Sequence, residues 1–303
     1  MAEKTKVGYI GLGAMGGAMA LNIAKAGFPL TVCDVDAGRV KTLTDAGASG
    51  AATAAEVAAA SDVVFTSLPG TPQVEAVFLG ANGVLDGAHE GLIAVDMSTV
   101  PPGVSRNVAE KAKAKGVDFL DAPVARTKEA AIAGTLAIMV GGSEEGYARI
   151  LPVLEVMGTT IVRVGDVGAG EVAKLLNNAI LMSNIVTACE ALLVGARAGV
   201  DTAKLVEVIS EGSGDSFALR NHVGKSVVPG EFAEGRFPLD YALKDLDYYF
   251  QLVRDTGSVC MQMSTSRELY YAARNLGFSK EYFPVVAEVI EVLGGGRIGP
   301  LPH

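Results

Sequence analysis

Short apolar runs alternate with segments of helical periodicity over the first half of the chain. The apolar runs predict strands at 7–10, 30–33, 63–67, 92–96, 118–120, 136–141 and 160–164. The segments between them predict helices at 15–26, 36–46, 54–60, 72–78, 102–115 and 144–155. This alternation indicates an α/β architecture, in which a doubly wound, mostly parallel sheet is covered by helices on both faces.

The pattern changes after Gly165. Residues 165–170, GDVGAG, are typical of a loop, and the rest of the chain is predicted to be helical, with glycine or proline at the breaks. The first helix, 171–198, is so apolar that we expect it to be buried nearly all round. Further helices are expected near 202–212, 239–256, 262–275 and 280–293. The chain should therefore form two domains, 1–165 around the sheet and 166–303 all helical.

The turn after the first predicted strand has the sequence GLGAMG at residues 11–16. Gly11 allows a tight turn, Gly13 lets the backbone approach a pyrophosphate, and Gly16 permits close packing of the helix on the strand. The N-terminus of that helix offers free N–H groups and the positive end of its dipole to phosphates. Because a strand precedes the motif and a helix follows it, the segment predicts a Rossmann-like dinucleotide-binding domain.

Asp34 ends the second predicted strand, 18 positions after Gly16. A carboxylate there accepts hydrogen bonds from the adenosine ribose and repels a 2′-phosphate, so we expect NAD rather than NADP as the cofactor. The alternative is that Asp34 is a helix N-cap or a turn residue. Arg39 lies nearby, but we expect it to project from the next helix, so NAD stays the expected cofactor.

Composition and charge narrow the class of protein. Half of the 303 residues are apolar and 19% are charged, which fits a compact enzyme and excludes disorder. The net charge of −9 argues against nucleic acid or an anionic membrane as a partner. The three cysteines, Cys33, Cys189 and Cys260, are widely separated, which indicates free buried thiols in a reducing compartment. The first ten residues lack the apolar core of a signal peptide, and the apolar stretch 179–189 is too short to span a bilayer.

Residues at the ends of the predicted strands are candidates for ligand contacts, because open α/β sheets bind ligands beyond the carboxyl ends of their strands. Leu68 follows one buried strand and would lie beside the cofactor. Thr99, in the segment DMST at 96–99, follows another and brings a hydroxyl within reach of the nicotinamide ribose or carboxamide. A turn or a helix cap is the alternative for each segment.

A third strand end leads through DAPVAR at residues 121–126. The guanidinium of Arg126 offers a planar fork for an anion such as a carboxylate, a sulfonate or a phosphate. The alternative is a solvated surface arginine.

Lys174, Asn177 and Asn178 give the strongest indication of catalysis. Positions i, i+3 and i+4 share one face of a helix, so three polar groups converge at the start of an otherwise apolar helix. Buried polar groups need partners or a function. Loss of solvation lowers the pKa of a lysine amine in a dry pocket, so that the amine can exchange a proton near neutral pH. The alternative is an ordinary first-turn cap with a lysine that reaches solvent.

Lys244 is a weaker candidate. It could reach the cofactor from a later helix, or it could form an exposed i, i+4 pair. The histidines contribute little, and no spacing of histidine, cysteine and acidic residues indicates a metal site.

Five ordered motifs together resemble the β-hydroxyacid dehydrogenase family, which includes 3-hydroxyisobutyrate dehydrogenase and tartronate semialdehyde reductase. They are GLGAMG (11–16), DMST (96–99), DAPV followed by GTLAIMVGG (121–142), GAGEVAKLLNN (168–178) and ALKDL (242–246), and the likeness covers nearly all of the chain. The resemblance implies a Rossmann-like domain followed by an all-helical domain. It also implies Lys174 as the catalytic acid/base, Asn178 as its substrate-orienting partner, and cofactor contacts at Gly11, Leu12, Gly13, Met15, Asp34, Leu68, Thr99 and Lys244.

One motif departs from the family pattern. Most members have DAPVSGG, where a serine hydroxyl and glycine amides hold the substrate carboxylate, whereas the matching residues here are Ala125, Arg126 and Thr127. This pattern looks like the sulfolactaldehyde reductase branch, in which the arginine grips a sulfonate. Leu181 stands where that branch carries a serine, so the substrate can differ.

These observations predict an enzyme, an NAD-dependent oxidoreductase that interconverts a small anionic β-hydroxy acid and its semialdehyde. Lys174 would protonate the carbonyl oxygen, and Arg126, Asn177 and Asn178 would hold the anion and the carbonyl. The first expected reaction is reduction of sulfolactaldehyde to 2,3-dihydroxypropanesulfonate, followed by activities of the 3-hydroxyisobutyrate or tartronate semialdehyde type. Imine reduction and a non-catalytic NAD-binding sensor are the rivals. We also expect a cytoplasmic homodimer or homotetramer.

Overall fold

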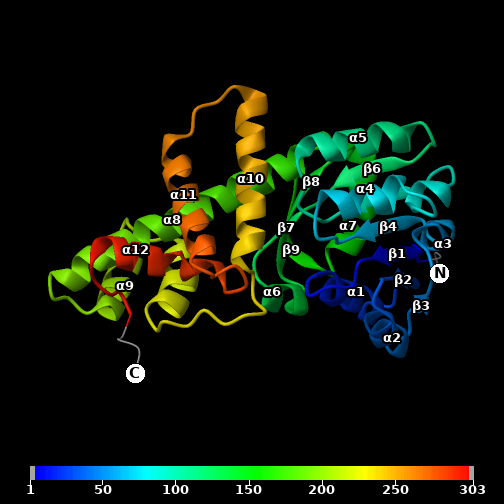
Figure 1. Cartoon of the computed structure of the whole chain (residues 1–303). Helices are drawn as coiled ribbons and strands as arrows, with labels where there is room; N and C mark the ends of the chain where they lie inside the picture. Colours follow the sequence, from blue (N-terminus) through cyan, green and yellow to red (C-terminus); the bar gives the residue numbers. More distant parts are fainter. Residues whose placement is uncertain (1–3, 300–303) are drawn as a thin grey trace. The chain divides into compact units, whose positions relative to one another are not determined.

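The computed structural model describes residues 4–299, which fall into two compact units (Figure 1). The first unit ends at Lys174 and the second begins at Leu175. The boundary expected at residue 165 falls before this division, because the first turn of the long helix packs against the ends of the strands.

Among the described residues, nine strands of the first unit form one sheet. They are β1 (Val7–Ile10), β2 (Leu30–Cys33), β3 (Ser49–Gly50), β4 (Val63–Thr66), β5 (Ile93–Asp96), β6 (Asp118–Asp121), β7 (Val124–Ala125), β8 (Leu136–Gly141) and β9 (Gly158–Gly165). The helices are α1 (Gly16–Lys25), α2 (Ala37–Asp45), α3 (Ala54–Ala59), α4 (Thr71–Leu79), α5 (Pro102–Lys113), α6 (Lys128–Ala133), α7 (Glu144–Leu154) and a short 3-10 turn, η1 (Val84–Asp86).

The strand order is β3-β2-β1-β4-β5-β6-β8-β7, and β9 pairs with β8. The strands β1 to β6 pair in parallel, whereas β8 runs antiparallel to β6 and β7 and parallel to β9. The mostly parallel, Rossmann-like sheet is therefore confirmed. The sequence pattern missed β3, β7 and α6, because strands of two residues and a helix of six leave too little periodicity to detect.

Alternate residues of the central strands enter two separate hydrophobic cores, one on each face of the sheet. Tyr9 and Phe65 face the core under α1 and α7. Ile10 and Val64 face the core under α3, α4 and α5. Since side chains point to opposite faces in turn, a sheet covered on both sides needs continuous apolar runs rather than alternation. This is why β1, β4 and β5 are buried at every position.

The second unit is helical. Its elements are α8 (Ala169–Arg197), which starts in the first unit, α9 (Thr202–Ser210), a π-helical segment η2 (Leu219–Val227), α10 (Leu239–Thr256), α11 (Met261–Asn275), a 3-10 turn η3 (Phe283–Val285) and α12 (Val286–Gly294). One core joins them, and the fully buried Tyr270 of α11 donates a hydrogen bond from its hydroxyl to the carbonyl of Met182 in α8 at 3.2 Å. The all-helical second part is therefore confirmed.

Helix α8 begins two residues earlier than predicted, ends one residue earlier, and is less buried than the sequence pattern predicted. Its 29 residues include a stretch with mean hydropathy 1.8, so length and composition alone would let it cross a membrane. Several of its apolar residues form the core of the second unit, among them Met182, Ile185 and Cys189. Leu176 and Ile180 are exposed, so the expected burial on nearly all sides is wrong.

Candidate active site

Two glycines in the turn between β1 and α1 occupy positions where the protein leaves no room for a side chain. Gly11 has φ +88°, and a Cβ on it would lie 2.3 Å from the carbonyl oxygen of Ser67. A Cβ on Gly16 would lie 2.0 Å from the carbonyl oxygen of Gly11. No side chain larger than hydrogen fits at either position, so the turn and the close start of α1 depend on both.

Gly13 differs from its neighbours in the same turn. A Cβ on Gly13 would meet only a guanidinium nitrogen of Arg39, at 3.9 Å, so packing within the protein does not demand a glycine there. Open space above a backbone at the N-terminus of a helix is what a pyrophosphate needs for close approach. The turn therefore fits a dinucleotide.

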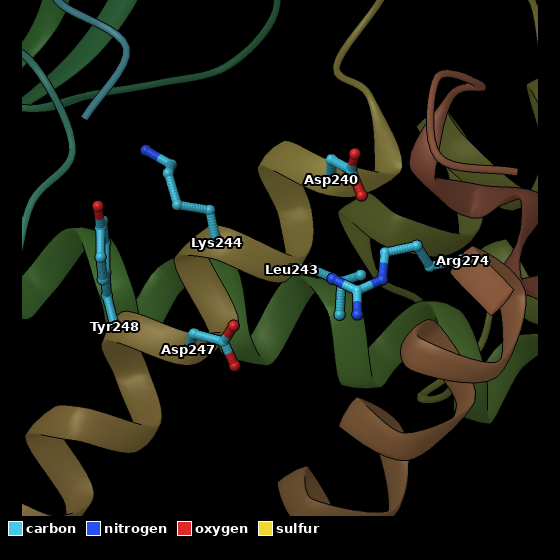
Figure 2. A pocket seen from close by; sticks show the side chains of 6 residues that line it. All are labelled: Asp240, Leu243, Lys244, Asp247, Tyr248 and Arg274. Carbon is cyan, nitrogen blue, oxygen red and sulfur yellow. The ribbon is translucent and has the colours of Figure 1, made fainter.

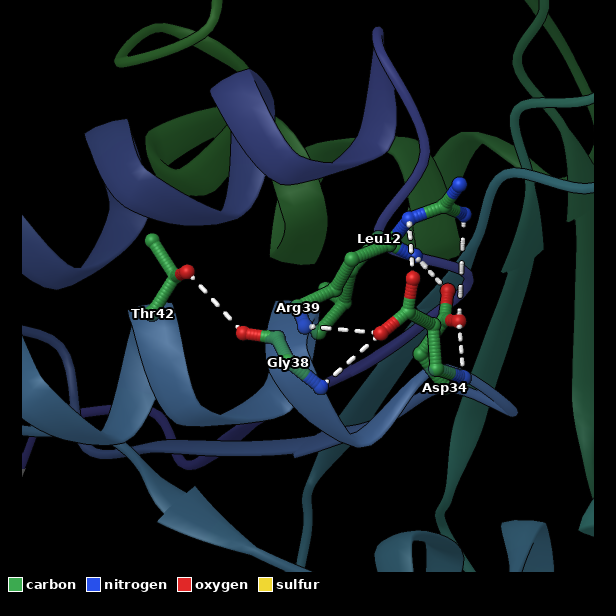
Figure 3. Close-up of polar contacts among 6 residues, drawn as sticks. Leu12, Asp34, Gly38, Arg39 and Thr42 are labelled. Atoms are coloured by element: carbon green, nitrogen blue, oxygen red, sulfur yellow. Dashed lines mark hydrogen bonds and ion pairs between the residues drawn. The ribbon is translucent and has the colours of Figure 1, made fainter.

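Asp34, at the end of β2, is tied to this turn. Its side chain is 5% exposed, and its carboxylate accepts hydrogen bonds from the backbone N–H of Leu12 at 2.5 Å and of Asp36 at 2.8 Å. The N-cap of α2 is Asp36, which accepts from the N–H groups of Gly38 and Arg39, so Asp34 is not a helix N-cap. The hydrogen bond that Asp34 accepts from the N–H of Asp36, two residues on, fits the other alternative, a turn residue. Figure 3 shows Asp34 below Leu12, with the guanidinium of Arg39 reaching back to it.

The ends of β4 and β5 are joined by a buried hydrogen-bond network. The carboxylate of Asp96 accepts from the hydroxyl of Thr66 at 2.7 Å and from the N–H and hydroxyl of Ser98 at 3.0 and 2.5 Å. The Ser98 hydroxyl in turn accepts from the N–H of Leu68 at 2.9 Å. Ser98 therefore shapes the loops, and Thr99, which is half-buried, is the hydroxyl of this segment that stays a candidate for the cofactor.

Asp121, at the end of β6, holds the start of α8. Its fully buried carboxylate accepts from the N–H of Gly168 at 2.6 Å and of Glu171 at 2.8 Å. Burial raises the pKa of Asp121 to about 6, against the two hydrogen bonds, which lower it. The carboxylate thus caps the helix one turn before Lys174.

Two motif glycines let α8 approach the strands this closely. A Cβ on Gly170 would lie 2.4 Å from the carbonyl oxygen of Met139, and one on Gly141 would lie 2.5 Å from the carboxylate of Asp121. Gly141 and Gly170 therefore serve the same contact, that between the start of α8 and the ends of β6 and β8. This contact fixes the position of α8 along these strands.

Polar side chains follow one another from α8 to α10. Lys174 is half-buried and stands one turn before Asn178, which is 5% exposed. The amide of Asn177 donates to the Asn178 side-chain oxygen at 3.0 Å, and the Asn178 amide donates to the carboxylate of Asp245 at 2.6 Å. We call Asn177, Asn178, Asp245 and Lys244 the polar chain. Asn177 and Asn178 are thus joined directly. The sequence predicts three buried polar groups at Lys174, Asn177 and Asn178, and this is wrong for Asn177, which is exposed, while Lys174 is only half-buried.

Asp245 is the residue of this group for which the sequence pattern predicted no role beyond its place next to Lys244. It is 2% exposed, and its second oxygen lies 3.3 Å from the Nζ of Lys244. Its position was a detectable signal, because an acid three residues after Ala242 falls on the apolar side of α10. Lys244 thus forms an ion pair with its sequence neighbour Asp245.

Lys244 also borders a cavity of about 350 Å³ on the second unit (Figure 2). Its ammonium lies 5.2 Å from the ring centre of Tyr248 and 5.7 Å from that of Tyr241. The cavity is otherwise lined by Asp240, Leu243, Asp247 and Arg274.

Arg126, just after β7, is exposed and has φ +87°. This left-handed conformation is unusual for an arginine. Its guanidinium donates to the carbonyl of Thr135 and to the hydroxyls of Thr159 and Thr160, the last two at 3.3 and 3.2 Å. An anion would have to share this guanidinium with the three threonines.

Among residues 4–299, no group of three or more histidines, cysteines and acids is arranged to hold a metal. His222 is buried and its Nδ1 lies 2.5 Å from the hydroxyl of Tyr282. Burial lowers the pKa of His222 to about 4. Because His222 is buried within the second unit, we interpret it as a structural residue.

Comparison with known proteins agrees with the geometry of both units. A family model described as the NAD-binding domain of 6-phosphogluconate dehydrogenase matches residues 6–165, and one described as NAD-binding of NADP-dependent 3-hydroxyisobutyrate dehydrogenase matches 168–289. The chain is 38% identical to 2-(hydroxymethyl)glutarate dehydrogenase of Eubacterium barkeri, over 97% of this chain and 98% of that one. It is 34% identical to 2-hydroxy-3-oxopropionate reductase of Escherichia coli, over 97% and 99%.

A solved structure is similar as well. The 3-hydroxyisobutyrate dehydrogenase of Mycobacterium tuberculosis, solved with L-serine, has a TM-score of 0.85 and 29% identity to this chain. The match covers 96% of this chain and 99% of the other.

Proposed function

The chain belongs to the 3-hydroxyisobutyrate dehydrogenase-like β-hydroxyacid dehydrogenases, and from that premise we propose that it interconverts a small anionic β-hydroxy acid and its semialdehyde, with NAD as the preferred cofactor. As a member of this family it is a dehydrogenase that uses a nicotinamide dinucleotide. The observation that carries the proposal is the lysine one turn before a buried asparagine, on a helix whose start is capped by Asp121.

In the proposed mechanism, Lys174 is the proton donor. Its Nζ gives a proton to the carbonyl oxygen of the semialdehyde in the reduction and takes it back in the oxidation. The nicotinamide dinucleotide, when bound, supplies or accepts the hydride. The residues that would hold it are Gly11, Leu12, Gly13, Met15, Asp34, Leu68, Thr99 and Lys244.

Asn178 orients the substrate beside the lysine. Because its amide donates to the buried carboxylate of Asp245, its side-chain oxygen points the other way, where it accepts from Asn177. The amide plane is therefore fixed before the substrate arrives, which lowers the cost of orientation in the transition state.

For the substrate, we propose sulfolactaldehyde first, reduced to 2,3-dihydroxypropanesulfonate. The support is Arg126 in place of a glycine, since a guanidinium fork suits a sulfonate better than a glycine amide does. The named relatives act on 2-(hydroxymethyl)glutarate and 2-hydroxy-3-oxopropionate, which are carboxylates. Substrates of the 3-hydroxyisobutyrate and tartronate semialdehyde type are therefore the second candidates.

The test is NADH oxidation by the purified enzyme, with three- and four-carbon aldehydes that carry a carboxylate, a sulfonate or a phosphate. We expect the highest kcat/KM with sulfolactaldehyde. Turnover of the carboxylates alone would reject the sulfonate and keep the family reaction, whereas no turnover with any aldehyde would reject the reaction itself.

Arg126→Ala tests the anion grip in the same assay. Its KM should rise by roughly tenfold or more, with the Kd of NADH unchanged, because a charged hydrogen bond to the substrate is lost. Arg149→Ala is the matched control, since Arg149 is also exposed and also donates to a backbone carbonyl. An unchanged KM in Arg126→Ala would make Arg126 a structural residue.

We also propose a cytoplasmic homodimer or homotetramer. The support is an exposed apolar surface on α8, formed by Leu176, Ile180 and Val194, and cysteines that are free. Of these cysteines, Cys189 is buried as expected, whereas Cys33 and Cys260 are only partly buried, so their expected burial is wrong. Sedimentation equilibrium should give a mass of two or four chains. A mass of one chain would reject the oligomer.

A further inference from the structure

The guanidinium of Arg39 lies between two carboxylates at the carboxyl end of β2. Its Nη1 is 3.8 Å from Asp34 Oδ1, and its Nε is 3.4 Å from Asp36 Oδ2. The sequence pattern predicts that Arg39 projects from the next helix. It does start on α2, but its side chain folds back over Asp34 toward Leu12 (Figure 3).

Arg39 faces the part of the turn that would hold the dinucleotide. The same Nη1 is the atom nearest to the open space above Gly13, 3.9 Å from where a Cβ would stand. The side chain is 51% exposed, so ligand can reach the guanidinium without a rearrangement of the core.

The charges around Asp34 therefore differ from those of a lone acid at this position. A lone carboxylate repels the 2′-phosphate of NADP. Here the carboxylate of Asp34 is satisfied by two backbone N–H groups and has a guanidinium beside it, which offsets its charge. The guanidinium carries five N–H donors, so it can face two carboxylates and still offer donors to a phosphate.

We propose that Arg39 is a specificity-determining residue that lets this enzyme bind the 2′-phosphate of NADP, so that its preference for NAD over NADP is narrow. Asp34 holds the ribose hydroxyls of NAD, and Arg39 neutralises that carboxylate and contacts the added phosphate of NADP. The inference rests on the proposed dinucleotide site, but not on the proposed substrate.

The experiment is isothermal titration calorimetry of the full chain with NADH and with NADPH, without substrate. In the wild type the two Kd values should lie within about tenfold of each other. In Arg39→Ala the Kd of NADPH should rise by roughly 10- to 100-fold, as expected for loss of a charge-assisted hydrogen bond, and that of NADH by less than about threefold. Lys41→Ala is the control, because Lys41 lies on the same helix and pairs with Asp45.

The converse variant sharpens the test. Asp34→Asn should raise the Kd of NADH and lower the Kd of NADPH. In the double variant Asp34→Asn/Arg39→Ala, the Kd of NADPH should no longer be lowered. If Arg39→Ala weakened the binding of NADH and of NADPH equally, Arg39 would stack on the adenine, which both share. If neither Kd changed, Arg39 would serve only as an ion-pair partner within the protein. Either result overturns the proposal. A wild type that binds neither dinucleotide would overturn the cofactor site itself, whereas binding without turnover would overturn only the proposed reaction.

Discussion

The glycine-rich turn of the first unit and the polar chain of the second, both of which we propose to hold polar ligands, are built by opposite means. In the turn, Gly11 and Gly16 are dictated by backbone atoms within 2.3 Å of where a Cβ would stand. In the polar chain, Asn178 is held by Asp245, a side chain 67 positions away. A site made of backbone can be recognised from a short segment, whereas a site made of side chains is recognisable only once the helices are packed.

The largest expected effect is on the free energy of unfolding, and it should differ between alanine substitutions at two glycines of the same turn. Gly16→Ala places a Cβ against a backbone oxygen that cannot move aside, so the free energy of unfolding should fall by about 3 kcal/mol or more. Gly13→Ala places its Cβ in open space and should leave that free energy nearly unchanged, while the Kd of NADH rises by about tenfold or more. Urea unfolding and calorimetry measure both. If Gly16→Ala and Gly13→Ala lowered the free energy of unfolding equally, the two glycines would not have the different roles described.

In the first unit, Asp121 should make stability depend on pH. Its folded pKa of about 6 is above the ordinary 3.8, so the stability it contributes is complete below pH 3.8 and is lost as the pH rises to about 6. The free energy of unfolding of the wild type minus that of Asp121→Asn should therefore fall by on the order of 3 kcal/mol across this window. A difference that stays constant from pH 4 to 7 would show that burial does not raise the pKa of Asp121.

His222, in the second unit, should act in the opposite direction. Its folded pKa of about 4 is below the ordinary 6.5, so its contribution is complete above pH 6.5 and is lost as the pH falls toward 4. The wild type should lose on the order of 3 kcal/mol relative to His222→Gln as the pH falls through this range. Unfolding curves at pH 4 to 7 measure it, and a loss toward high pH would contradict the buried neutral imidazole.

We expect Asp245 to act as a positioning residue, so that Asp245→Ala should affect turnover more than cofactor binding. Without it, the buried amide of Asn178 loses its acceptor, so kcat should fall by roughly 10- to 100-fold while the Kd of NADH changes little. Asp245→Asn keeps an acceptor oxygen and should restore part of kcat. Asp247→Ala on the same helix, which loses contacts to Arg267 and Tyr271 instead, is the control. If KM rose and kcat did not change, Asp245 would not act through Asn178.

The sequence predicted most of the first unit, because continuous apolar runs mark strands that are buried on both faces and glycines mark turns with no room for a Cβ. It did not predict β7 or α6, which are too short to show a period, or the orientation of Arg39, which depends on charges that the fold brings together. Lys174 and Asn178 were visible as polar positions on an apolar helix. Asp245 stood on the apolar side of α10, but its partner could not be identified from spacing alone.

The central claim is that Lys174 donates the proton to the substrate. The most direct test compares turnover of the wild type with that of Lys174→Ala at saturating aldehyde and NADH, together with the Kd of NADH. We expect Lys174→Ala to lower kcat by about 10²- to 10⁴-fold, to leave the Kd of NADH unchanged, and to recover part of its turnover with added methylamine. Near-normal turnover in Lys174→Ala would contradict the claim.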